Sequence, residues 1–297
     1  DAGLVYRWGD VSETELDLVT QGLGKHCEIA APGPDEKDDK IGFLLNRPAT
    51  WEGGRLLRGC DPRRIELAFA ELGLVGATPK STRGAKVTKL ERKAAKPLPP
   101  AAMSADRSAA ARIGYISHAP AELNLTQLKH IGGGLVGTPR VALEFRAQAR
   151  AEMATALEGT DYGGCPIMRR SSLGGVVLDG VNPLMAWSVA QAISPPSCGE
   201  NELRGCVKAC AEGFGVISGF GDLGEQKALR VGVDSSAALG VARRICLGKL
   251  KHIDARYLWA QHARNQNRLA VFKVLGASNG ANPMTKYVDK SPPNYDM

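Results

Sequence analysis

The feature that most constrains the fold is the order of strand-like and helix-like runs in residues 151–297. Three strand-like stretches come first, and the last two are joined by a tight turn at residues 180–183. Residues 199–218 then carry apolar side chains at helical spacing. The remaining runs are a strand at 228–233, helices at 235–247 and 253–262, and a strand at 269–275. This order predicts an α/β unit with a mixed sheet.

The part of the chain before residue 151 predicts smaller elements. Residues 41–58 have the pattern of a hairpin of two short strands. A helix is expected to begin after Asp61, an N-cap residue followed by proline, and to end at Gly73. A further helical stretch at residues 125–130 is followed by three successive glycines at 132–134, which we expect to interrupt it because glycine disfavours helix.

Residues 78–104 differ in composition from both flanks. They are rich in Lys, Arg, Pro and Ala and have few large apolar side chains. Such a segment buries too little apolar surface to order itself, so we interpret it as a linker.

The charge balance favours a polyanionic partner. The net charge is +7 and the isoelectric point is about 9.1. Nucleic acid is the first candidate and an anionic membrane the second, while a solvated basic surface without a partner is the alternative. The sequence has no apolar run near 18 residues and no signal-like start, so we expect no membrane segment.

The seven cysteines are irregularly spaced and form no C-x-x-C pair, and no histidine lies at zinc-ligand spacing from a cysteine pair. We interpret them as buried thiols in a reducing compartment and expect an intracellular protein, cytoplasmic or nuclear. Because the chain begins at Asp1 without methionine, we also expect it to be a piece of a longer protein.

Four segments of the second half resemble one known family. The sequence VDSSAALGVARRICLGKLKHIDARYLWAQ (233–261) resembles a pattern of Asp-Ser-Ser-Ala-Ala, then Arg/Lys-His-Ile and Leu-Trp-x-Gln. Residues 169–191, 197–215 and 279–288 resemble that family's Arg-Arg-Ser-Thr-Ser-Gly-Gly, Ser-Ser-Gly-Glu-Ala-Glu and Asn-x-Ala-Asp-x-Leu-Thr-Lys segments, in the same order. The family is the Pol polyprotein of copia-type LTR retrotransposons, and the matching part is its ribonuclease H domain.

The resemblance extends upstream. The segments LLNRPATW (44–51) and CDPRRIELAFAELGL (60–74) resemble the region after the polymerase palm, and LKHIGGGLVGTPRVALEF (128–145) resembles the connection, from which one helix is absent here. The sequence has no Tyr-x-Asp-Asp-type site, so we do not expect this chain to synthesise DNA by itself.

The resemblance implies a fold and a division of the chain. The fold is α/β, with a ribonuclease H-like mixed five-stranded sheet and flanking helices, preceded by a smaller α+β reverse-transcriptase thumb/connection remnant. The expected segments are a reverse transcriptase C-terminal remnant (1–77), the basic linker (78–104), a truncated connection (105–150) and the ribonuclease H-like domain (151–297).

The resemblance also implies a chemistry, the hydrolysis of RNA in RNA–DNA hybrids with two Mg²⁺ (or Mn²⁺) ions held by four carboxylates. Glu202 matches the helical carboxylate and Asp234 the one that ends a strand, and these two are the expected catalytic and metal-binding residues. The alternative for Glu202 is an exposed acid paired with Lys or Arg. The alternative for Asp234 is an N-cap of the helix that starts at Ser235.

The other two carboxylate positions depart from the family's pattern. Counting back from Cys165, the first aspartate falls on Gly159, and Asn282 stands in place of the last one, as a degenerate ligand. Asp161 matches a second acid of the first motif and is a weak candidate ligand. Glu158 is adjacent but is expected to point to the opposite face of the sheet. We therefore expect weakened cation binding and lost or reduced hydrolysis.

Basic residues supply candidate phosphate contacts, with a solvated face as the alternative. They are Arg243, Arg244, Lys249, Lys251, His252 and Arg256. The expected partners are an RNA–DNA hybrid or other nucleic acid and the remainder of the Pol polyprotein. Two further interpretations stay open: a non-catalytic nucleic-acid-binding module, and a translated relic without a role.

Overall fold

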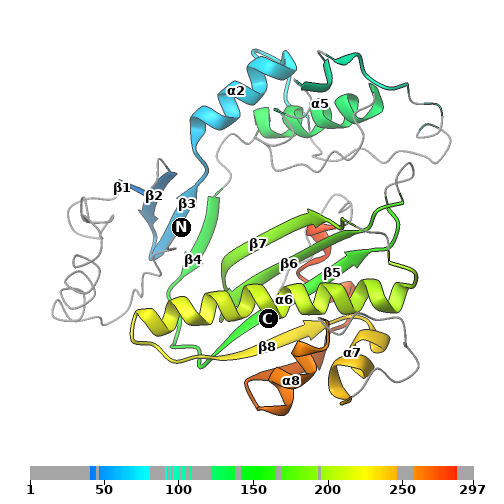
Figure 1. The fold of residues 1–297 in the computed structure, drawn as a ribbon. Helices are drawn as coiled ribbons and strands as arrows, with labels where there is room; N and C mark the ends of the chain where they lie inside the picture. The colour runs from blue at the N-terminus through cyan, green and yellow to red at the C-terminus, as the bar shows by residue number, and fades with distance from the viewer. Residues whose placement is uncertain are drawn as a thin grey trace.

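The computed structural model describes residues 41–44, 47–80, 122–137, 142–164, 169–192, 195–245 and 257–285, with a few positions between 91 and 108. Two sheets occur in this described part of the chain, one of four strands and one of five (Figure 1). The four-stranded sheet has the order β1-β2-β3-β4, and the five-stranded sheet has the order β7-β6-β5-β8-β9.

The five-stranded sheet is mixed. Its central strand β5 pairs antiparallel with β6 on one side and parallel with β8 on the other, and β7 and β9 form the two edges. The strands are β5 (Met153–Asp161), β6 (Ser172–Asp179), β7 (Asn182–Ala190), β8 (Ala228–Val233) and β9 (Leu269–Lys273). The predicted ribonuclease H-like mixed sheet is thereby confirmed.

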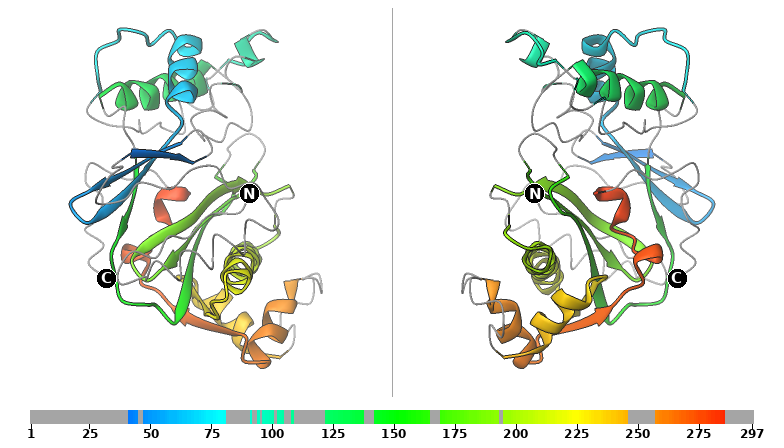
Figure 2. Two further views of the ribbon diagram at one scale, coloured as in Figure 1. Left: turned by 90° about the vertical axis from the view of Figure 1, so that its left-hand side faces the viewer. Right: turned by 90° about the vertical axis from the view of Figure 1, so that its right-hand side faces the viewer.

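The long helix α6 (Cys198–Asp222) crosses one face of this sheet (Figures 1 and 2). It begins where Ser197 serves as N-cap and its Oγ accepts a hydrogen bond from the backbone nitrogen of Glu200, at 3.2 Å. Its sheet-facing side includes Leu203, Cys206 and Cys210, which are buried in the main apolar core. Helices α7 (Ser236–Arg243) and α8 (Trp259–Asn265) pack into the same core.

The other face of β5 is covered by the C-terminal segment. This segment contains the short 3₁₀ helices η2 (Gly276–Ser278) and η3 (Asn282–Met284). A Cβ at Gly174 of β6 would lie 2.5 Å from Met284, so the segment packs tightly on the sheet. As a result, seven consecutive residues of β5, from 154 to 160, are buried.

The four-stranded sheet contains the hairpin expected at residues 41–58. Its strands are β1 (Ile41–Leu44), β2 (Arg47–Glu52), β3 (Arg55–Gly59) and β4 (Ala142–Arg146). The helix expected after Asp61 is α2 (Pro62–Leu72), and Asp61 Oδ1 accepts from the backbone nitrogen of Arg63, at 3.1 Å. It ends at Gly73, whose φ of 65° is in the left-handed region that glycine adopts without strain.

Strand β4 joins parts of the chain that are distant in sequence. It pairs with β3 in the register Leu56 to Phe145. Its last residue also contacts the larger sheet, because the backbone nitrogen of Arg146 donates to Asn182 Oδ1 at 2.7 Å, and Asn182 Nδ2 donates to the Arg146 carbonyl at 2.9 Å. The proposed borders at residues 77, 104 and 150 remain predictions.

Helix α5 (Glu122–Gly137) continues through the three glycines, so the interruption expected at residues 132–134 was wrong. Tertiary contacts explain this, because other side chains pack closely against the helix at these glycines. A Cβ at Gly132 would collide with Leu74, and a Cβ at Gly133 would lie 3.0 Å from the Lys80 side chain. Within the predicted linker, Leu98 is buried and the Lys96 carbonyl accepts from the backbone nitrogen of Glu122.

None of the helices in the described part of the chain combines the length and the apolarity needed to cross a membrane.

A buried ion pair ties the start of β8 to the end of β6. Lys227, 2% exposed, donates from Nζ to Asp179 Oδ1 and to the Ala151 carbonyl, each at 2.7 Å, and lies over the ring of Phe220. Asp179→Asn leaves this ammonium group without its charge partner, and we expect it to lower the free energy of unfolding by about 3 kcal/mol.

Urea unfolding followed by circular dichroism measures this loss. The control is Arg150→Gln, which removes the exposed pair with Glu225 and should cost less than about 1 kcal/mol. Equal losses in the two variants would contradict the stabilising role of the Lys227–Asp179 pair.

Candidate metal centre

Three carboxylates converge at one end of the five-stranded sheet. Glu158 of β5, Glu202 of α6 and Asp234, directly after β8, each offer an oxygen atom, and these atoms all lie within 4.8 Å of one another. In the described part of the chain, this is the one group of three or more His, Cys, Asp or Glu side chains with such spacing.

The sheet topology explains the convergence. Strands β5 and β8 are neighbours and parallel, so their carboxyl ends lie at the same end of the sheet. The first turns of α6 pass over this end of the sheet (Figure 1), and Glu202 in these turns lies beside Glu158 and Asp234. Glu158 is fully buried, whereas Glu202 and Asp234 are half-buried, so the group has an inner side and a side that solvent can reach.

The orientation expected for Glu158 was wrong. Its side chain points to the α6 face of the sheet, because a Cβ on Gly205 of α6 would collide with Glu158 Oε2. Gly159, counted as the site position, faces the other side of β5, where a Cβ would lie 3.6 Å from Ala281. The alternation along the strand was right, but the residue that faces the helix is 158 rather than 159. Cys165, from which the position was counted, lies outside the described residues.

Asp234 and Glu202, both expected as ligands, are brought together with Glu158. The N-cap role considered for Asp234 belongs instead to Ser235, whose Oγ accepts from the backbone nitrogen of Ala238 at 3.2 Å. Asp161 lies on the opposite face of β5 from Glu158 and outside the carboxylate group. Its carboxylate occupies the space beside Gly164, in the turn that follows the strand.

Asn279 is a site residue that the sequence analysis missed. It is fully buried, and its Nδ2 donates to the Glu158 carbonyl at 2.7 Å and to Asp234 Oδ2 at 3.3 Å. Its Oδ1 accepts from the backbone nitrogen of Ala281, which fixes the orientation of the amide. Asn282, the expected degenerate ligand, donates from Nδ2 to the Gly276 carbonyl at 2.6 Å. The available signal for Asn279 was its match to the first residue of the closing family segment.

Buried polar contacts hold the start of α6 against the end of β5. Asn201, fully buried, donates from Nδ2 to Thr160 Oγ1 at 2.8 Å, and its Oδ1 accepts from Gln191 Nε2 at 2.5 Å. One turn along, Arg204 pairs with buried Glu200 at 2.5 Å, and its guanidinium lies 5.0 Å from the ring centroid of Tyr257. These contacts fix the helix from which Glu202 extends.

The donor set fits a hard divalent cation. Three carboxylate groups with oxygen atoms within 4.8 Å repel one another when ionised, and one of them is fully buried. A divalent cation offsets that repulsion, and carboxylate oxygens are the ligands that Mg²⁺ and Mn²⁺ prefer. The three residues that would hold such an ion are Glu158, Glu202 and Asp234.

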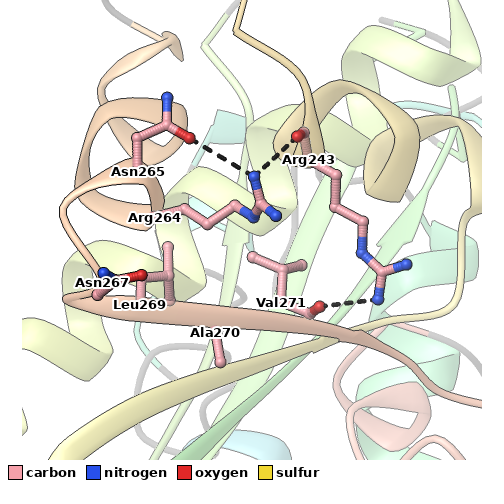
Figure 3. Close-up of a pocket in the computed structure, with 7 residues that line it drawn as sticks. All are labelled: Arg243, Arg264, Asn265, Asn267, Leu269, Ala270 and Val271. Carbon is pink, nitrogen blue, oxygen red and sulfur yellow. Dashed lines mark hydrogen bonds between the residues drawn. The ribbon is translucent and has the colours of Figure 1, made fainter.

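Of the six candidate phosphate-contacting residues, two lie within the described part. Arg243 donates from Nη2 to the Val271 carbonyl at 3.1 Å, and Arg264 donates to the Arg243 carbonyl at 2.9 Å. With Asn265 and Asn267, these arginines line a pocket beside β9 (Figure 3). Arg244 is half-exposed. The other four candidates lie outside the described residues: Lys249, Lys251, His252 and Arg256.

Comparisons with known proteins give structural likenesses alone. No family model matches the chain, and no curated protein does. LC11-RNase H1, isolated from compost by a metagenomic approach, is 14% identical with a TM-score of 0.37, over 45% of this chain and 93% of that one. The same enzyme in complex with an RNA/DNA hybrid is 19% identical with a TM-score of 0.33, over 44% and 93%.

A third similar structure is the prototype foamy virus protease-reverse transcriptase, which is 13% identical with a TM-score of 0.31, over 43% of this chain and 18% of that one. Because all these scores are low, the fold described above rests on strand order and pairing.

Cys198, in the first turn of α6, reports on the charge of the site. Partial desolvation and the negative charges of Glu202 and Asp234 raise the pKa of its thiol above the ordinary value. Removing one of these charges should lower the pKa and increase the thiolate fraction at pH 8. We therefore expect Glu202→Gln to speed the alkylation of Cys198 by iodoacetamide.

Peptide mass spectrometry over a time course measures the rate at Cys198, with Cys60 of the same sample as the internal control. An unchanged rate at Cys198 in the variant would show that the Glu202 charge does not reach this thiol.

Proposed function

We propose that residues 151–297 form the ribonuclease H domain of a copia-type LTR retrotransposon Pol polyprotein, which hydrolyses the RNA strand of RNA–DNA hybrids with Mg²⁺ or Mn²⁺. The observation that carries this proposal is the convergence of Glu158, Glu202 and Asp234 at the carboxyl end of two parallel strands. The four family-like segments support the copia-type origin, since two of them contain Glu202 and Asp234. A third begins at Asn279, which donates to the Glu158 carbonyl and to Asp234.

The residues of the chain would share the work as follows. Glu202 and Asp234, on the solvent-accessible side, would hold the cation where a phosphodiester can approach, and Glu158 would hold it from the buried side. Asn279 fixes one oxygen of Asp234 and the end of β5. The chemistry supplied by a bound divalent cation is a lowered pKa of the attacking water and stabilisation of charge on the phosphate.

We further propose that this chain hydrolyses the RNA strand more slowly than a domain whose site has four carboxylates. The resemblance implies a fourth carboxylate, and the closing segment of this chain has Asn282 at that position instead. An amide offers a neutral oxygen, so the site compensates less of the charge of two divalent cations.

The proposed partners are an RNA–DNA hybrid and the remainder of the Pol polyprotein, and the proposed location is the cytoplasm or the nucleus. The net charge of +7 and the arginines of the β9 pocket favour contact with a phosphate backbone. They also favour a second function, binding of nucleic acid without cleavage.

A cleavage assay separates these functions. With an end-labelled RNA strand in a hybrid and Mg²⁺ or Mn²⁺, we expect slow cleavage by the wild-type chain. We expect a rate lower by about a hundredfold or more in each of three variants, Glu158→Gln, Glu202→Gln and Asp234→Asn. Changing a residue that only supports a metal ligand already costs up to about a hundredfold, and a ligand itself should cost at least as much. Asp161→Asn is the matched control, because its carboxylate lies outside the group, and it should cleave like the wild type.

Two results would overturn parts of the proposal. Wild-type activity in Glu158→Gln would remove Glu158 from the site. A wild-type chain that binds the hybrid at low salt, loses it as salt is raised, and does not cleave it with either cation would support the non-catalytic function instead.

A further inference from the structure

Gly205 of α6 lies directly opposite the carboxylate of Glu158. A Cβ at this position would collide with Glu158 Oε2, would lie 3.3 Å from Glu158 Cδ, and would lie 2.6 Å from Thr160 Cγ2. Gly205 is buried on the side of the helix that faces the sheet. The Glu158 carboxylate therefore occupies the space that a side chain at position 205 would fill.

Helix propensity does not explain a glycine here, because glycine destabilises a helix interior relative to alanine. Other glycines of α6 show the contrast. Gly215 and Gly219 have nothing within 4 Å of an added Cβ, whereas Gly213 approaches Leu229 to 2.5 Å, two turns farther from the acids. Gly205 thus has no room for a Cβ, and the group that would collide with one is a carboxylate of the candidate metal centre.

We propose that Gly205 is a positioning residue for that centre, which allows a glutamate, rather than a shorter acid, to supply the buried ligand from β5. This inference rests on the proposed function in one respect, that Glu158 binds the cation. It adds that the position of the Glu158 carboxylate is set by the absence of a side chain on the facing helix.

The two contacts of an added methyl group differ in how they can be relieved. The Glu158 carboxylate ends a flexible side chain and can turn away, whereas Thr160 is β-branched and is held by the hydrogen bond from Asn201. Gly205→Ala should therefore displace the carboxylate, and its contact with Thr160 should in addition lower the melting temperature. It would separate Glu158 from Glu202 and Asp234.

The test measures cation binding rather than activity. Isothermal titration of the full chain with Mn²⁺, and separately with Mg²⁺, gives the affinity, and circular dichroism gives the melting temperature. We expect Gly205→Ala to weaken binding by about ten- to a hundredfold, the range found for residues that orient metal ligands.

Two glycines of the same helix serve as matched controls. Gly215→Ala should leave cation affinity unchanged because it adds a methyl group in open space. Gly213→Ala should lower the melting temperature through its contact with Leu229 and still leave cation affinity unchanged, which separates positioning from a general loss of stability.

A double-mutant cycle identifies the group that responds. Glu158→Asp shortens the acid, so adding Gly205→Ala to it should change affinity by less than about threefold, whereas the same alanine is costly beside glutamate. Thr160→Ser removes the second contact, and adding it to Gly205→Ala should not restore binding.

Each outcome decides the matter. Unchanged affinity in Gly205→Ala, an equal loss in the Glu158→Asp background, or rescue by Thr160→Ser overturns the inference while the proposed function stands. A wild-type chain that binds neither cation overturns both. If Gly205→Ala alone does not fold, the Glu158→Asp/Gly205→Ala chain should still fold and bind like Glu158→Asp, and its failure to fold overturns the inference.

Discussion

The parallel pairing of β5 with β8 is the interaction on which the carboxylate group depends. It brings the carboxyl ends of two strands, separated by more than 70 residues of chain, to one end of the sheet. The last pair joins Leu157, directly before Glu158, to Gly232, two residues before Asp234. Helix α6, which follows β7 and precedes β8, crosses one face of the sheet, and its first turns lie at that same end. A site assembled this way forms only when the whole sheet has formed, so the repulsion among its acids is offset by the hydrogen bonds and the apolar core of the sheet.

Much of the larger sheet could be predicted from the sequence. The order of apolar runs after residue 151 indicated the strands and the long helix, because their periodicity is set by burial on one or two faces. The cap chemistry around Asp61 and Gly73 likewise predicted α2 from local residues alone. Contacts between segments distant in sequence could not be predicted. The continuity of α5 through its glycines depends on Leu74 and Lys80, and the pairing of β4 with β3 joins segments that no local pattern connects.

The site was predictable only in part. Glu202 and Asp234 followed from the family-like segments around them, and the structure brings both together. Glu158 was assigned to the wrong face because the site position was counted back from Cys165 to Gly159. An alternation of polar and apolar residues, which would have identified the helix-facing side, is absent because β5 is buried on both sides. Asn279 was missed because its part is to bond a backbone carbonyl of β5 and an oxygen of Asp234, and such pairings depend on the tertiary fold.

The contacts at residues 146–148 bear on where the chain can be divided. Gln148 Nε2 donates to the Asp179 carbonyl at 2.6 Å and its Oε1 accepts from the Val181 nitrogen at 2.8 Å, closing the turn between β6 and β7. Since β7 is an edge strand, a chain trimmed to begin at residue 151 would lose both this clasp and the Arg146–Asn182 bonds. The exposed edge of β7 could then pair with the same strand of another copy, so the shorter chain would tend to self-associate.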